Sequence, residues 1–195
     1  METNEKVLTG DESLQIISEM INRTKVNIRQ GSFHLLFWGW LIFFCSLGEY
    51  LLVRLTDLRD PWLIWLLVIP GVFVSLIYGY IKGKSSPFHT YADMLYMWTW
   101  MGFMIAAIVL FIIISDRIES VAPFILTLAG IPTFISGFII RFRPLIAGGL
   151  SFWALALVSY FAGPAAAPLA VPAAMLTGYL LPGYLLKRKV DHEAV

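Results

Sequence analysis

The sequence predicts an all-α membrane protein, a polytopic bundle of six transmembrane helices. Of its 195 residues, 58% are hydrophobic and 14% are charged, and the mean hydropathy is +0.76. Soluble domains average about 25% charged residues, so this composition is too apolar for one of them. Apolar stretches of about 20 residues, the length that crosses a bilayer, recur along the chain. With their short loops they fill residues 33–186, which we expect to form one transmembrane domain.

Six spans are predicted. They are residues 33–53, 61–81, 94–115, 121–140, 145–161 and 165–186. The fifth is the shortest and lies between Pro144 and Gly163, so it fits either a short spanning helix or a re-entrant segment. Crossing is favoured, because otherwise the basic tail would be separated from most other basic residues.

The basic residues give the spans an orientation. Of the 14 lysines and arginines, only Arg54, Arg59 and Arg117 lie on one side of the six-span arrangement. The other side has the N-terminal segment 1–32, the loops 82–93 and 141–144, and the tail 187–195. Since basic residues near span ends stay inside, both termini are predicted to be cytoplasmic. These residues form no basic face, so nucleic acid is not an expected partner.

An amphipathic helix is predicted ahead of the first span, over about residues 9–30. Thr9 and Glu12 stand in the positions of a capping box. A narrow stripe then recurs at spacings of three and four, at Leu14, Ile17, Ile21, Thr24 and Ile28. Three arrangements remain open: the helix lies on the inner leaflet, packs beneath the bundle, or binds a protein partner or a second copy of the chain.

Small residues form ridges along the second, fourth and sixth spans. The ridges are Gly71, Ser75, Gly79 and Gly83; Ala129, Thr133 and Gly137; and Ala166, Ala170, Ala174 and Gly178. Membrane helices associate through close backbone approach along such ridges. We therefore expect the even-numbered spans to be the central ones.

In each of these spans small residues stand one and five places after a proline: Gly71 and Ser75 after Pro70, Thr133 and Gly137 after Pro132, and Ala173 and Thr177 after Pro172. We expect these prolines to break the helices near mid-membrane depth. The motifs Trp38-Gly39-Trp40 and Trp98-Thr99-Trp100 also correspond in position. Three helical hairpins repeated in tandem would explain both patterns; the alternative is coincidence, because proline and small residues are common in membrane helices.

Charge inside the spans is confined to Glu49, near the outer end of the first span. It is expected to reach the interface or to pair with Arg54, and the functional alternative is a cation or proton site. A weaker polar cluster consists of His34, His89 and Asp93. These three would bind a metal only if they converged, and we expect interfacial side chains instead.

No catalytic residue, metal or cofactor is expected. The hydroxyl groups in the spans are not set beside a histidine or lysine, as a nucleophile and its base would be. The single cysteine, Cys45, is expected to be buried as a small apolar residue.

Two stretches carry a resemblance to known proteins: the run from Glu12 to Ile21, and Leu36-Phe37-Trp38-Gly39-Trp40. They resemble an uncharacterised family of small bacterial inner-membrane proteins with an amphipathic N-terminal helix ahead of several spans. The resemblance covers about the first 40 residues. It implies a bacterial inner membrane and brings no activity, cofactor or site.

Two functions remain for such a chain. The first is a non-enzymatic accessory, sensory or regulatory protein that acts through its bundle and its cytoplasmic helix. The alternative is a transporter or channel for a small neutral or hydrophobic solute, which needs a hydrophilic cavity at the bilayer midplane. Membrane lipid is the expected partner in both.

Overall fold

The computed structural model describes residues 10–83, 91–114, 121–162 and 167–192, with side chains for 32–81, 91, 94–113, 121–162 and 167–189. The helices are α1 (Gly10–Leu55), η1 (Pro61–Leu67), α2 (Val68–Gly83), α3 (Tyr91–Ile114), α4 (Ala122–Ile139), α5 (Arg143–Phe161), α6 (Ala167–Met175), η2 (Leu176–Leu180) and α7 (Leu181–His192). No strand occurs in these ranges. η1 is a 3-10 helix and η2 is a π-helix.

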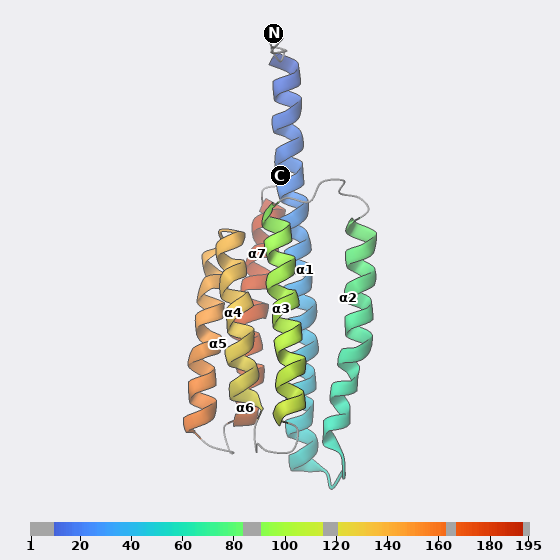
Figure 1. Ribbon diagram of the computed structural model, residues 1–195, viewed down its shortest axis with the longest axis vertical. Helices are drawn as coiled ribbons and strands as arrows, with labels where there is room; N and C mark the ends of the chain where they lie inside the picture. The colour runs from blue at the N-terminus through green and yellow to red at the C-terminus, as the bar shows by residue number, and fades with distance from the viewer. Residues whose placement is uncertain (1–9, 84–90, 115–120, 163–166, 193–195) are drawn as a thin grey trace.

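Six stretches are long and apolar enough to cross a membrane, which confirms the predicted six-helix bundle. They are Ser32–Leu55, Pro61–Ile81, Met94–Ile113, Ala122–Ile139, Arg143–Phe161 and Ala167–Lys189. The sixth span is composite, since α6, η2 and α7 follow one another without a gap. The fifth span is a continuous helix of 19 residues that lies beside α4 (Figure 1). It is long and apolar enough to cross a membrane, as the predicted spanning helix requires.

α1 runs unbroken from the N-terminal segment into the first span. It contains 46 residues, or about 69 Å at 1.5 Å per residue. Its N-terminal part extends past the bundle along the bundle axis (Figure 1). The sequence predicts a separate helix here, but Gly31 alone weakens a helix without ending it, and no proline lies between it and the span. Thr9 lies outside the described residues, as do the side chains of the predicted stripe.

The bundle has two distinct ends. α1 enters the bundle and α7 finishes at the same end, which we call the terminal end (Figure 1). α1 and α5 finish, and α4 and α6 begin, at the opposite end, which we call the distal end (Figure 1).

The sixth span is the centre of the packing. Of its most apolar stretch, 61% is buried, against 39% for the fourth span and 6% for the second. Its segments α6 and α7 both pack on α1, and α6 also packs on α4 and α5. The prediction that the even-numbered spans are central is therefore right for the fourth and sixth and wrong for the second. In the described chain the second span packs mainly on α1.

α4 and α5 form the most extensive helix pair, and glycines on both helices allow it. A Cβ added at Gly149 would lie 2.7 Å from the Cα of Phe134, and one added at Gly137 would lie 2.7 Å from the backbone nitrogen of Ile146. No real side chain tolerates such distances. The two backbones are therefore in direct contact, as small-residue packing in membranes requires.

A tight turn between the two helices sets up this pairing. Arg141 has a φ of 51°, the left-handed conformation that usually ends a helix at glycine. The backbone N–H of Phe142 donates to the carbonyl of Gly137 at 2.8 Å, and the N–H of Arg141 donates to that of Phe138 at 3.1 Å. These two bonds are those of a Schellman motif, which satisfies the last carbonyls of α4 and reverses the chain.

Candidate functional site

The intramembrane carboxylate of Glu49 is paired with an indole. The Nε1–H group of Trp65 donates to Oε2 of Glu49 at 2.8 Å. The expected pairing with Arg54 is wrong, because the guanidinium of Arg54 lies over the ring of Tyr50, 5.7 Å from its centroid. Arg54 and Glu49 share one helix at a spacing of five residues, which does not bring side chains together, whereas Trp65 comes from a neighbouring element.

η1 holds Trp65 in this position. It begins with Pro61, which fixes φ at the first turn. The Ile64 side chain fills the space above Gly48, and the carbonyl of Ile64 lies 3.6 Å from Sγ of Cys45. Cys45 is 1% exposed, which confirms the prediction of a buried, apolar cysteine. Among the described residues, the Glu49 carboxylate has a neutral indole donor and no second charged group in contact with it.

The polar cluster proposed from His34, His89 and Asp93 is not assembled by the described residues. The His34 ring packs edge-on against Tyr78 at 5.5 Å and Phe33 at 5.6 Å, between the first and second spans. His89 and the side chain of Asp93 lie outside the described part of the chain. Within that part, no three His, Cys, Asp or Glu side chains come together in a way that could hold a metal.

Two of the three predicted helix breaks are wrong. Pro132 is buried inside an uninterrupted α4, and Pro172 is likewise inside α6, so neither proline breaks its helix. Pro70 lies in the first turn of α2, just after the 3-10 helix η1 ends. A proline is tolerated in a first turn because the N–H groups there have no partner within the helix.

Two of the three small-residue ridges are packing surfaces. Ala129 and Thr133 are buried, and so are Ala170 and Ala174. Gly178 faces the ring of Phe152. Ala166 lies outside the described residues.

Only part of the small-residue ridge on the second span contacts another helix. A Cβ at Gly71 would meet the side chain of Leu41, and the hydroxyl of Ser75 accepts from the indole of Trp38 at 3.3 Å. One turn further on, nothing lies within 4 Å of a Cβ at Gly79. Gly79 is therefore not a packing residue in the described structure. The description of Gly83 is limited to its backbone.

The sixth span contains a wide turn that the sequence analysis missed. The N–H of Leu181 bonds to the carbonyl of Leu176, five residues back. The next residue is the fully buried Pro182, which has no N–H for a regular α-helical bond to Gly178. Gly178 then lies against α5, where a Cβ at Gly148 would be 2.8 Å from its carbonyl oxygen. The available signal in the sequence was Pro182, four residues after Gly178.

Hydroxyls and indoles of different spans meet in the interior. Thr133 is 0% exposed and lies 3.4 Å from the Tyr179 hydroxyl on the wide turn. Trp100 donates to the buried Ser136 at 3.2 Å. In the described part of the chain, the buried hydroxyl groups belong to serines, threonines and Tyr179, and no charged side chain is buried. The hydroxyls of Thr133, Ser136 and Tyr179 bond to protein groups of the bundle itself and provide no charge for an ion.

The indole-to-hydroxyl bonds bear on the predicted hairpin repeat. Trp38 bonds to Ser75 in the first hairpin, and Trp100 bonds to Ser136 in the second. Trp38 is the first tryptophan of its motif, however, whereas Trp100 is the second of its own, so the two bonds are out of register. The third hairpin is joined by hydroxyls, at 3.0 Å between Ser151 and Thr177. The repeat stays a prediction.

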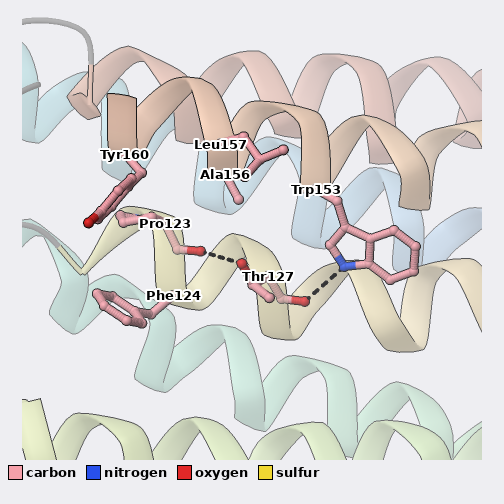
Figure 2. Close-up of a pocket in the computed structure, with 7 residues that line it drawn as sticks. All are labelled: Pro123, Phe124, Thr127, Trp153, Ala156, Leu157 and Tyr160. Carbon is pink, nitrogen blue, oxygen red and sulfur yellow. Dashed lines mark hydrogen bonds between the residues drawn. The ribbon is translucent and has the colours of Figure 1, made fainter. Parts of the chain in front are cut away.

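A groove lies between the distal parts of α4 and α5, with a volume of about 350 Å³ (Figure 2). It is lined by Pro123, Phe124 and Thr127 of α4 and by Trp153, Ala156, Leu157 and Tyr160 of α5. The Trp153 indole donates to the carbonyl of Thr127 at 3.1 Å, and the Thr127 hydroxyl donates to the carbonyl of Pro123 at 2.7 Å. None of these residues was a predicted site residue.

The six apolar helices make the chain a multi-pass membrane protein. Comparison with protein-family models, with curated proteins and with solved structures finds no match to it.

Proposed function

We propose that the chain is a non-enzymatic accessory, sensory or regulatory protein of a bacterial inner membrane, with both termini in the cytoplasm. The observation that carries the proposal is the continuity of α1 over 46 residues. About 33 Å of this helix, residues 10–31, precedes the first span. An unbroken helix transmits a rotation or displacement at one end to the other, because its backbone hydrogen bonds resist bending.

The interior supports a role other than catalysis or ion transport. Charged side chains inside a membrane usually mark ion or proton pathways. In the described chain the buried polar side chains are neutral, and the half-buried Glu49 bonds to an indole. A signal carried by α1 into the bundle needs no such pathway.

A flexible insertion tests whether α1 acts as one rod. Three glycines inserted after Gly31 keep the N-terminal segment and the spans, and break only their mechanical continuity. A matched control inserts three alanines, which keep the helix and rotate the segment by about 300°. We expect the glycine variant to lose complementation of a deletion strain. Full complementation by the glycine variant would instead indicate a separable module.

The alternative function, a transporter or channel for a small neutral or hydrophobic solute, is favoured by one observation. The π-helix η2 places Tyr179 beside Thr133 in the interior, and π-helices often occur at functional sites. Swelling of proteoliposomes in glycerol or urea, measured by light scattering, separates the two functions. The regulatory function predicts the same rate as protein-free vesicles. A faster rate that falls in a Thr133→Val variant would favour the transporter.

A further inference from the structure

The groove between α4 and α5 has a definite structural origin. The backbones of α4 and α5 touch at two glycines, where Gly137 of α4 lies against Ile146 and Gly149 of α5 lies against Phe134. Distal to Gly130 on α4 and to Gly149 on α5, neither helix contains a glycine that would let the backbones touch. The Trp153 ring covers Gly130, where an added Cβ would lie 2.5 Å from its Nε1. This ring closes the inner end of the groove.

The polar groups of the groove are already satisfied. The carbonyl of Thr127 accepts from Trp153, and the hydroxyl of Thr127 bonds within its own helix (Figure 2). The remaining lining, apart from Tyr160, consists of apolar side chains. A polar solute would lose its hydration here without gaining hydrogen bonds. The occupant that fits is therefore apolar along most of its length.

The groove opens toward the surroundings of the bundle. Leu157 on its rim is 60% exposed and Tyr160 is 68% exposed. Because α4 and α5 are both membrane spans, the medium outside is lipid at this depth. From Trp153 to Tyr160 the groove follows α5 for about 10 Å. An elongated chain lying along the helix matches this shape.

Tyr160 gives the groove a polar end. It lies in the last turn of α5, at the distal end, and in Figure 2 it lies at the end of the groove opposite Trp153. Its hydroxyl has no hydrogen-bond partner in the described part of the chain. Tyrosine at a span end commonly meets the headgroup region.

We propose that this groove binds one acyl chain of a membrane phospholipid from the leaflet at the distal end. The chain lies between α4 and α5 with its inner segment against Ala156 and Trp153. The ester or headgroup region meets the Tyr160 hydroxyl. The site is independent of the function proposed for α1.

The test is photolabelling of the full chain in vesicles of phosphatidylethanolamine and phosphatidylglycerol. A trace of phosphatidylglycerol carries a diazirine in one acyl chain, and mass spectrometry locates the labelled residues. We expect labelling at Ala156 and Leu157 several-fold above that at Leu150, which is exposed on the same helix. Equal labelling at these positions would mean only bulk lipid contact and would overturn the proposal.

Two variants fill the groove, and a third is the control. Ala156→Phe occupies its floor, and Leu157→Trp covers it from an exposed position that is safe for folding. Ala154→Phe adds the same bulk on an exposed part of α5. We expect labelling of the groove to fall several-fold in the first two variants and to stay unchanged in the third. Unchanged labelling in Leu157→Trp, or crosslinks between two copies of the chain through this face, would overturn the proposal.

Discussion

The carboxylate of Glu49 accepts its hydrogen bond from the indole of Trp65 and not from a basic residue. A Glu49→Gln change keeps an oxygen that can accept the same bond, so we expect it to fold normally with a melting temperature within about 2 °C of the parent. Trp65→Phe removes the donor and should cost about 1 kcal/mol, because the carboxylate is only half buried. Thermal unfolding in detergent measures both. A Glu49→Gln protein that folds but loses a proton- or cation-coupled flux in liposomes would favour transport.

Glycine substitutions should separate packed from open positions. Gly149→Ala places a Cβ against the backbone of Phe134, where neither helix can yield, and should cost about 1–3 kcal/mol. Gly79→Ala and Gly102→Ala meet nothing within 4 Å. Since alanine favours a helix, they should be neutral or stabilise by up to about 1 kcal/mol. Equal losses at all three positions in detergent would show that the open faces are also contact surfaces.

Ser159 should be better replaced by alanine. Its Oγ is buried and has no hydrogen-bond partner among the described residues, so the hydroxyl is desolvated without compensation. Ser159→Ala should therefore stabilise the protein by about 1 kcal/mol, or about 2–4 °C in melting temperature. Ser136→Ala is the matched control and should destabilise, because it leaves the Trp100 indole unpaired. A loss of stability in Ser159→Ala would indicate a bound water at that hydroxyl.

Arg141 occupies a position that glycine would fill without strain. A left-handed conformation costs a non-glycine residue about 1–2 kcal/mol, so Arg141→Gly should raise the free energy of unfolding by about 1 kcal/mol. Arg141→Ala keeps a Cβ and should not, which separates backbone strain from loss of the charge. A stabilisation in Arg141→Ala as large as in Arg141→Gly would assign the effect to the charge.

Reporter fusions test the orientation. Fusions after Asp57, Glu119 and Gly163 should report the outside, and fusions after Lys84, Arg143 and Lys189 should report the cytoplasm. A cytoplasmic signal at Gly163 would contradict the proposed orientation of the last two spans.

The sequence predicts the spans well because length and hydropathy alone set them. It also identifies Thr133, Ala174 and Gly178 as packing residues, since small residues in a row favour close helix contact. The same rule wrongly predicts a helix contact at Gly79, because a row of small residues does not show that a partner helix lies beside it. The partner of Glu49 could not be predicted either, since Trp65 reaches it only through the 3-10 geometry of η1.

The groove and the wide turn were missed for a related reason. The groove depends on the spacing between two helices, and the wide turn depends on a local departure from α-helical geometry. Neither can be predicted from hydropathy. Gly148 and Gly149 form an adjacent pair in the sequence, yet only their contacts with Gly178 and Phe134 show what the pair does. The continuity of α1 was missed because a glycine and a polar stretch at residues 29–32 read as a boundary.

The π-helix η2 also changes how the sixth span tolerates altered length. α6 and α7 both pack on α1, so the faces on either side of η2 must stay in phase. A residue deleted from within α6 or α7 turns one face away from α1 by about 100°. A residue deleted from Leu176–Leu180 converts the π-helical turn into an α-helical one, because the backbone hydrogen bonds then join residues four apart and not five. The faces of α6 and α7 both stay directed at α1. This short segment is where evolution can add or remove one residue without changing the register of the bundle.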